Sequence, residues 1–409
     1  MFDLLDELLF PPERYSLTPR LDSSFAHQFD DLPVSPLRAV TRGRTRFLNY
    51  REEELTPALV ESAPLTTRIV RSPLVTRFEE DKREQAATQD APRHWSGAIY
   101  TSGGQLLPEF EELRERFNGP GSNGYNLYTN PPHADAARMS SARRLAGRHV
   151  YMGHLRSHFG HFLLESLARA WAIVDLDATA KILFHPASQR RHAVPAFAQE
   201  IFAAMDIDPA RIVIADEDLV PEEIVVPTAQ FWINSKGSPG MCIAFDHMRE
   251  RLSRSSSPKS LPRRVYLTRR LMDQPMQRRA AHFAANSTRH DHIVAKTLVN
   301  EDEVEALFAA RGFEIIAPET RSLRDQVSLV ANASAIAGVT GSALHLALFN
   351  DNPETKLIAL DLRASVNQLV LEQIRGTRAF HINCIGAHDE QGRPRLDCGL
   401  IWQALKEIL

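Results

Sequence analysis

The sequence is poor in cysteine and has no long apolar run. Its three cysteines, Cys242, Cys384 and Cys398, are far apart and odd in number, so a disulfide framework is not expected and a reducing compartment fits. No run of about 18 apolar residues predicts a membrane span. The chain begins Met-Phe-Asp-Leu-Leu-Asp-Glu, which is acidic where a signal peptide is basic. We therefore expect a cytoplasmic protein, with peripheral association at the inner face of a membrane left open.

Two common functional classes are also disfavoured by what is missing. The net charge of −3 lacks the basic excess of a general nucleic-acid-binding protein. No Gly-x-Gly-x-x-Gly follows a strand, which argues against a dinucleotide-dependent dehydrogenase. The 409 residues do have 43% apolar side chains, so the chain is typical of a globular protein with two domains and extensions.

The last third of the chain alternates short apolar strands with helices. Strands are expected over 265–268, 313–317, 335–339, 356–362 and 379–385, and helices over 300–311, 322–331, from 342 onward and over 366–375. This alternation implies parallel βαβ units with right-handed crossovers, and so a Rossmann-like domain.

The middle of the chain predicts a second unit of the same kind. Its expected strands are 149–152, 181–184, 211–214 and 223–226, and its helices are 157–174 and 196–205. We therefore expect an α/β fold with two Rossmann-like domains facing across a cleft, with the ligand at the carboxyl ends of the strands. The predicted parts are an unassigned N-terminal extension (1–95), a first domain (96–252), a Ser/Pro-rich linker (253–263), a second domain (264–390) and a C-terminal helix (391–409).

A glycine turn follows the strand at 335–339. Gly338 and Gly341 lie three residues apart, and a helix begins at Ser342. The free N–H groups and the dipole of such a helix start favour an anion, most often a phosphate. The alternative is that the glycines only close an ordinary strand-to-helix turn.

His158, His161 and Glu165 are spaced three and four residues apart and share one helical face. A zinc site is one interpretation, although the spacing is not a common zinc motif. Another is capping and packing, with Glu165 paired to Arg169. The third is a histidine that acts as a general base while Glu165 orients it, because an imidazole titrates near working pH.

Three charged side chains follow strands of the second domain. Arg269 and Arg270 come after the strand at 265–268, where guanidinium groups face the ligand in this architecture and bind phosphate oxygens. Glu319 follows the strand at 313–317 and is placed to accept hydrogen bonds from a ribose diol. The alternatives are a surface arginine pair and a solvated loop acid.

Six motifs, taken in order and at these distances, resemble glycosyltransferase family 61. They are His-Phe-Leu-Leu-Glu (161–165), Tyr-Leu-Thr-Arg-Arg (266–270), Asn-Glu-Asp-Glu-Val (300–304), Gly-Phe-Glu-Ile-Ile-Ala-Pro-Glu (312–319), Ser-Leu-Arg-Asp-Gln (322–326) and Ala-Gly-Val-Thr-Gly-Ser-Ala-Leu-His (337–345). The resemblance covers roughly residues 147–362. It implies a GT-B fold and an inverting, metal-independent transfer from a nucleotide-diphosphate sugar, with no cofactor and with a UDP-linked donor favoured.

The resemblance also implies site residues. In the donor domain, Arg269, with Arg270, and the amides of Gly341 and Ser342 would hold the diphosphate, and Glu319 would contact the ribose or base. The same donor set includes Gly338, Thr340 and His345. In the acceptor domain, His158 or His161 would remove the proton from the attacking hydroxyl, beside Glu165.

The chain departs from the family pattern at two places. Many members have a histidine where this chain has Thr340, so a phosphate contact is either missing or moved to His345. Residues 272–296 form a basic insertion, which is interpreted either as a lid over an anionic substrate or as a solvated loop.

The function predicted from these patterns is a bacterial glycosyltransferase that builds a surface polysaccharide, either capsule or O-chain, on a saccharide or glycolipid acceptor. Two alternatives stay open. One is a nucleotide-sugar epimerase of related fold, and the other is a non-catalytic scaffold in a polysaccharide assembly complex.

Overall fold

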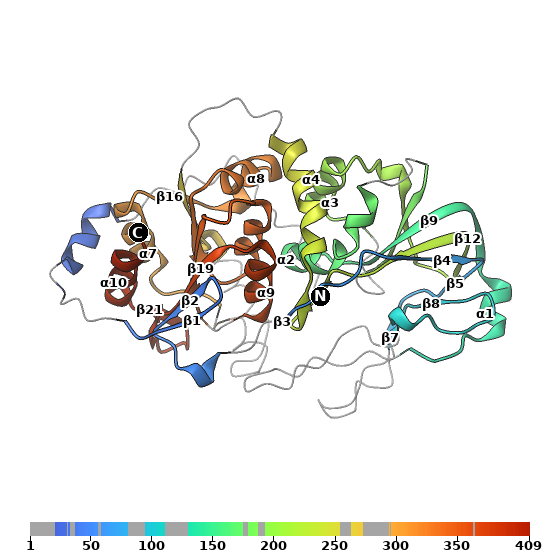
Figure 1. The fold of residues 1–409 in the computed structure, drawn as a ribbon, viewed down its shortest axis with the longest axis horizontal. Coiled ribbons are helices and arrows are strands. Elements are labelled where there is room, and N and C mark those ends of the chain that lie inside the picture. The colour runs from blue at the N-terminus through green and yellow to red at the C-terminus, as the bar shows by residue number, and fades with distance from the viewer. Residues whose placement is uncertain are drawn as a thin grey trace. The chain divides into compact units, whose positions relative to one another are not determined.

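The chain forms two compact units, each containing both helices and strands, in a computed structural model (Figure 1). Unit 1 combines Met1–Pro57 with Leu252–Leu409, and unit 2 is Ala58–Arg251. The residues that the structure describes are 21–30, 32, 37–55, 59–80, 95–110, 130–174, 179–186, 193–253, 263–272, 294, 296–362 and 365–409.

Unit 1 is built on a seven-stranded sheet in the order β1-β2-β19-β18-β17-β15-β16. All neighbours are parallel except the β1–β2 pair. The strands are β1 (Ala39–Arg42), β2 (Thr45–Leu48), β15 (Arg264–Leu267), β16 (Glu314–Ile316), β17 (Ala335–Val339), β18 (Lys356–Asp361) and β19 (Arg378–Asn383). Because β16 lies on one side of β15 and β17 on the other, the winding direction reverses between β15 and β17.

Helices cover both faces of this sheet (Figure 1). On one face α7 (Glu301–Ala310) packs with α10 (Cys398–Ile408) and with the 3-10 helix η2 (Ser23–Phe29). On the other, α8 (Leu323–Ala331) and α9 (Val366–Arg375) pack against the 3-10 helix η12 (Ser342–Phe349). The core of the first face includes Tyr266, Phe308 and Trp402. A hairpin of β20 (Ile385–His388) and β21 (Pro394–Leu396) precedes α10.

Unit 2 contains a second seven-stranded sheet in the order β11-β10-β9-β12-β5-β8, with β4 also paired to β12. Strands β9 to β12 are parallel to one another, whereas β4 and β5 are antiparallel to β12 and β8 is antiparallel to β5. The strands are β4 (Thr67–Arg71), β5 (Leu74–Val75), β8 (Ile99–Tyr100), β9 (Arg143–Leu155), β10 (Lys181–Pro186), β11 (Ile212–Ile214) and β12 (Leu219–Pro227). The winding of this sheet reverses between β9 and β12.

The longer helices of unit 2 are α1 (Ala136–Ser141), α3 (Ala196–Ala204) and α4 (Cys242–Ser253). Small sheets complete the unit: β3 (Leu59–Val60) pairs β14 (Lys236–Gly237), which pairs β13 (Phe231–Trp232), and β6 (Glu79–Glu80) pairs β7 (Trp95–Ser96). In the part of the chain that the structure describes, no helix is long and apolar enough to span a membrane.

The alternating strands and helices predicted from the sequence are present in both units, but some helices differ in kind. The helix expected from Ser342 onward is the 3-10 helix η12. The helix predicted over 157–174 is broken into α2 (Phe159–His161), the π-helix η6 (Phe162–Ser166) and the 3-10 helix η7 (Ala170–Ile173). The Leu167 amide donates to the Phe162 carbonyl, five residues back instead of the four of an α-helix, so the helix is locally wider and under-wound at this point.

The described part of the N-terminal extension is shared between the two units. Strands β1 and β2 join the sheet of unit 1, whereas β3 to β6 belong to unit 2. Most of the predicted linker, 254–262, and most of the basic insertion, 273–293 and 295, lie outside the described residues. The domain boundaries drawn from the sequence therefore stay predictions.

Candidate functional site

Several of the predicted donor residues of unit 1 gather where its sheet reverses direction. Ligands of open parallel sheets bind outside the carboxyl ends of the strands at such a reversal. Arg269 follows β15 and Gly341 follows β17, the two strands on either side of it. A Cβ at Gly341 would lie 4.0 Å from Arg269 Nη1, so the guanidinium group lies directly beside the glycine turn.

Arg269 is held in place from both of its ends. Its backbone amide donates to Glu301 Oε1 at 2.6 Å, and its Nη2 donates to the Lys296 carbonyl at 3.0 Å. These two bonds fix the side chain while its Nη1 lies toward Gly341. A guanidinium group fixed in this way presents a permanent positive charge to an anion bound at the turn.

The turn itself exposes unpaired amides. Gly341 precedes η12 in an extended conformation, and no side chain caps the helix. The Leu344 amide bonds the Gly341 carbonyl, but among the described residues no backbone hydrogen bond satisfies the amides of Ser342 and Ala343. Such amides together with a positive helix end are the usual elements of a phosphate site.

Gly338 has a different task from Gly341. It lies inside β17, opposite Leu267 of β15, and a Cβ there would be 2.9 Å from the Leu267 carbonyl oxygen. That carbonyl is backbone and cannot turn away, so only glycine fits. The structure therefore places Gly338 in the sheet, where it permits the close approach of β15 and β17.

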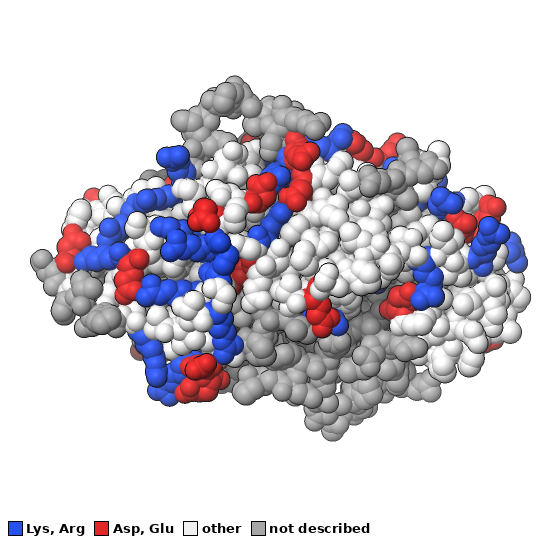
Figure 2. Space-filling view, in the orientation of Figure 1, with Lys and Arg blue, Asp and Glu red and all other residues white. Residues whose placement is uncertain are grey.

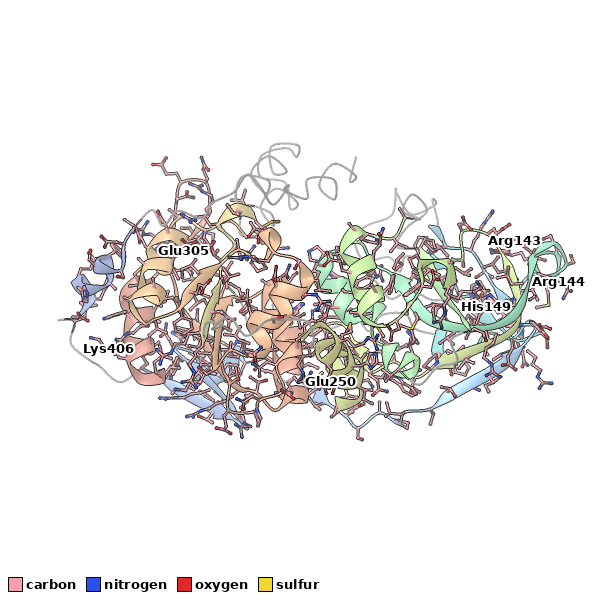
Figure 3. All side chains as sticks on the ribbon, turned by 90° about the horizontal axis from the view of Figure 1, so that it is seen from above. Arg143, Arg144, His149, Glu250, Glu305 and Lys406 are labelled. Carbon is pink, nitrogen blue, oxygen red and sulfur yellow. The ribbon has the colours of Figure 1, made fainter. Side chains whose placement is uncertain are left out.

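Arg270 lies toward the protein interior. Its Nε is 3.2 Å from Glu305 Oε1, and the two side chains are only 11% and 5% exposed. Glu305, labelled on α7 in Figure 3, also lies 2.6 Å from the Thr268 hydroxyl, and that hydroxyl accepts from the Arg270 amide. These contacts tie the segment after β15 to α7. The phosphate contact predicted for Arg270 stays a prediction.

Glu319 has a buried hydrogen-bond acceptor that feels the positive charge of Arg269. It lies in the 3-10 helix η11 (Pro318–Thr320) after β16, and its Oε1 is buried with no hydrogen-bond partner among the described residues. Burial raises the pKa of Glu319, while its own backbone amide and the charge of Arg269 oppose the shift. A buried oxygen without a partner is costly, so a hydroxyl donated by a ligand would be favourable here.

Thr340 and His345 complete the predicted donor set. The Thr340 hydroxyl donates to Asp361 Oδ1 and its amide donates to the Leu360 carbonyl at 2.9 Å, so both groups are directed to β18. His345 is buried within η12, 8% exposed. The phosphate contacts predicted for Thr340 and His345 stay predictions.

The predicted histidine site of unit 2 follows β9, at the reversal of that sheet. His161 Nδ1 lies 2.5 Å from Glu165 Oε2, and Arg156 Nη2 donates to Glu165 Oε1 at 3.1 Å. The His158 and His161 rings meet edge to face, with centroids 5.2 Å apart. A carboxylate only accepts, so the short contact assigns the proton of the His161 ring to Nδ1 and makes Nε2 the acceptor.

The pairing of Glu165 with Arg169, which the packing interpretation invoked, does not occur. The Arg169 Nε donates to the Pro227 carbonyl at 3.0 Å, and its guanidinium lies over the Tyr151 ring. The charge partner of Glu165 is instead Arg156, which the sequence analysis did not single out. Its position directly after β9 was an available signal, because side chains at carboxyl strand ends face the ligand in this architecture.

A metal site is not visible in the described part of the chain. No group of three or more His, Cys, Asp or Glu side chains there is arranged to hold an ion. Metal independence remains a prediction.

Comparison with known proteins gives a match to one family model. A family model described as Glycosyltransferase 61 matches residues 159–358, just under half of the chain. The matched segment contains His161, Glu165, Arg269 and the glycine turn. This match supports glycosyltransferase family 61, and with it a glycosyltransferase activity with a donor and an acceptor. No curated protein matches the chain.

Proposed function

We propose that this chain is an inverting, metal-independent glycosyltransferase of family 61 that moves a sugar from a nucleotide-diphosphate sugar to a saccharide acceptor. The observation that carries the proposal is Arg269, whose Nη1 lies beside the Gly341 turn at the reversal of a parallel sheet. The match to the family supports the same reaction class.

In this proposal unit 1 binds the donor. The Arg269 guanidinium and the amides of Ser342 and Ala343 hold the diphosphate, and the buried Glu319 carboxylate accepts hydrogen bonds from the ribose diol. Basic side chains gather over unit 1 on the face drawn in Figure 2, which favours an anionic ligand there. A UDP-linked sugar is the favoured donor.

Unit 2 supplies the base, the division of roles found in a GT-B enzyme. His161 Nε2 takes the proton of the acceptor hydroxyl, and Glu165 holds the other ring nitrogen. The acceptor oxygen attacks the anomeric carbon on the face opposite the nucleotide, and the bond from that carbon to the phosphate oxygen breaks. The nucleoside diphosphate leaves with the bonding electrons, and Arg269 with the turn amides stabilises the charge that develops on it.

The proposed place of this reaction is bacterial surface polysaccharide synthesis, either capsule or O-chain, at the cytoplasmic face of the membrane. The acceptor would then be a growing saccharide or a glycolipid. Two other functions would follow from different results: turnover of a nucleotide sugar without any acceptor indicates an epimerase, and no nucleotide binding at all indicates a scaffold.

The first experiment is thermal unfolding of the whole chain with UDP, GDP, CMP and ADP, in EDTA and in magnesium. A ligand that binds only the native state stabilises it by about 2.7 kcal/mol at 100 times its Kd, so binding raises Tm. We expect UDP to raise Tm in EDTA for the wild type and not for Arg269→Ala.

Arg264→Ala is the matched control. It removes the same charge from the opposite end of the same strand, where Arg264 bonds the Arg311 carbonyl. A UDP-dependent rise in Tm that survives in Arg269→Ala would contradict the donor site, and so would the absence of a response to every nucleotide.

A further inference from the structure

A buried polar network connects the glycine turn of unit 1 to the N-terminal segment. At its centre His381 of β19 lies between Asp361 and Glu372, with its Nδ1 2.7 Å from Asp361 Oδ2 and its Nε2 3.0 Å from Glu372 Oε2. All three side chains are closed off from solvent. We call these residues, with the hydroxyls of Tyr50, Thr45 and Thr340 that bond them, the Asp361 network.

The charges in this network are matched. Both ring nitrogens of His381 face acceptor oxygens, so both carry protons and the ring is a cation. Burial alone would lower the pKa of His381, but the charges of Asp361 and Glu372 and the bonds to both carboxylates raise it well above its usual value. Burial raises the pKa of Glu372, which the His381 charge opposes.

Three hydroxyls also donate to the two carboxylates. The Tyr50 hydroxyl donates to Asp361 Oδ2 at 2.5 Å, Thr340 donates to Asp361 Oδ1, and Thr45 donates to Glu372 Oε1 at 3.0 Å. Every carboxylate oxygen of the network therefore has a donor. A fully satisfied buried network is rigid, whereas losing one donor leaves a buried charge partly unpaired.

The network holds the residue from which the glycine turn begins. Thr340 separates β17 from Gly341, and it is attached to β18 at two points, through its amide to the Leu360 carbonyl and through its hydroxyl to Asp361. These two bonds fix the position and rotation of the peptide that leads into the turn. Tyr50 comes from the N-terminal segment, so this segment acts on the turn through Asp361.

We propose that Asp361 is a positioning residue for diphosphate binding: with Tyr50 and His381 it orients Thr340, and through Thr340 it places the amides of the Gly341 turn beside Arg269. This inference rests on the proposed donor site. An apolar core would stabilise the sheet as well as these buried charges do. What the network adds is a directional bond to the turn.

The test compares Thr340→Val, which removes the hydroxyl at constant shape, with Thr340→Ser, which keeps it. UDP is the probe, with its Kd measured calorimetrically on the whole chain, and donor KM and kcat are measured with UDP-sugars. We expect Thr340→Val to raise Kd and KM together by about tenfold, a loss of about 1.4 kcal/mol in binding, with a smaller change in kcat. Thr340→Ser should bind UDP as the wild type does.

Tyr50→Phe provides a second, milder variant, which remains informative if Thr340→Val does not fold. It should weaken UDP binding in the same direction. Because both hydroxyls act through Asp361, the double variant should lose less affinity than the sum of the two single losses. A wild-type Kd in both Thr340→Val and Tyr50→Phe, or strictly additive losses, would overturn the inference.

Arg269→Ala distinguishes a wrong positioning role for Asp361 from a wrong assignment of the donor site. If Arg269→Ala abolishes UDP binding while Thr340→Val keeps it, the donor site stands and the positioning role is wrong. If the wild type binds no nucleotide, both are wrong.

Discussion

At the scale of single residues, the Glu165 carboxylate determines which nitrogen of His161 accepts a proton. Because the Glu165 carboxylate is paired with Nδ1 of His161, Nε2 is the basic position of that ring. The His161 side chain is 40% exposed, so the acceptor hydroxyl of a saccharide can reach it. Arg156 binds the other carboxylate oxygen and holds Glu165 in place. The structure thus favours His161 over His158 as the general base.

His161→Ala should lower kcat by about a hundredfold or more, the usual contribution of a general base, while the Kd for UDP stays unchanged. His158→Ala is the matched control and should lower kcat by less than about tenfold. Steady-state kinetics with a UDP-sugar donor measure both. A loss of less than tenfold for both variants would show that neither histidine is the base.

A second histidine, His185, makes the stability of unit 2 depend on pH. Its Nδ1 lies 2.9 Å from the Tyr151 hydroxyl and its Nε2 lies 2.9 Å from the Thr76 carbonyl, so it is held as the neutral ring. Burial lowers the pKa of His185 to about 4, although the bond to Thr76 opposes this. In the unfolded chain the pKa is about 6.5.

Because the unfolded chain binds this proton first, acidification favours unfolding. The stabilisation from neutral His185 is complete above about pH 6.5 and is lost as pH falls toward 4, by about 2.5 kcal/mol between pH 7 and pH 4.5. Urea unfolding of the wild type and of His185→Gln measures it. We expect a shallower pH dependence in His185→Gln, and equal slopes in the two proteins would contradict this assignment.

At the scale of elements, Gly338 within β17 and Gly341 in the turn after it have different structural roles. Gly338 permits the contact between β17 and β15, whereas Gly341 leaves room beside Arg269. Gly341 has an extended backbone that any residue can adopt, so its smallness matters for the ligand and not for the fold.

Gly338→Ala should destabilise the chain by about 1–3 kcal/mol, because its methyl group would lie against the Leu267 carbonyl. Gly341→Ala should keep the wild-type Tm, since its nearest neighbours are 3.9 and 4.0 Å away, but should weaken UDP binding about tenfold, because the methyl group fills the space by the guanidinium. Thermal unfolding and calorimetry separate the two effects. Equal loss of Tm in both variants would argue against this division of roles.

Local signals explain which elements the sequence could predict. Ser322 caps α8 by accepting from the Asp325 amide, and Gly312 follows the end of α7 with a positive φ; both features depend only on residues within a few positions. The start of α7 depends on a distant contact as well. The Asn300 side chain makes no cap bond to the helix backbone; it donates to Glu303 Oε2 and, on β21, donates to the Leu396 carbonyl and accepts from the Leu396 amide. Leu396 is about a hundred residues away, which no local pattern reveals.

The candidate sites likewise contain residues that the sequence pattern predicts and contacts that it does not. Arg269 and Gly341 were predictable because each follows a strand in an alternating pattern, and that pattern determines which end of the sheet they share. The bond from Thr340 to Asp361 and the pairing of Arg156 with Glu165 depend on side-chain directions at a chain reversal and at a π-helix. Neither direction is encoded by spacing alone.

At the scale of the whole molecule, the N-terminal segment is part of the sheet of unit 1. Strand β2 pairs with β19 in parallel, and the Phe47 ring stacks on His381 with centroids 5.3 Å apart. The segment therefore contributes core packing as well as the Tyr50 and Thr45 hydroxyls. Its composition alone did not assign it to either domain.

Phe47→Ala should lower the free energy of unfolding by about 3–5 kcal/mol, because a buried ring is removed from the core. Ile69→Ala, on β4 and 57% exposed, should change it by less than about 0.5 kcal/mol. Urea unfolding measures both, and hydrogen exchange of the β19 amides should increase only in Phe47→Ala. A wild-type free energy of unfolding in Phe47→Ala would mean that the N-terminal segment is dispensable for the stability of unit 1.

The divided chain of unit 1 also has a consequence during protein synthesis. About 330 residues separate Leu48 at the end of β2 from Arg378 at the start of β19, its partner in the sheet. At about 5–20 residues per second, a ribosome needs roughly 15–65 s to cover that distance. Unit 2 is continuous and is complete long before then. Strand β2 pairs with the nearby β1 but has no neighbour on its other edge until β19 has been made, so the β2–β19 pairing is among the last contacts of unit 1 to form.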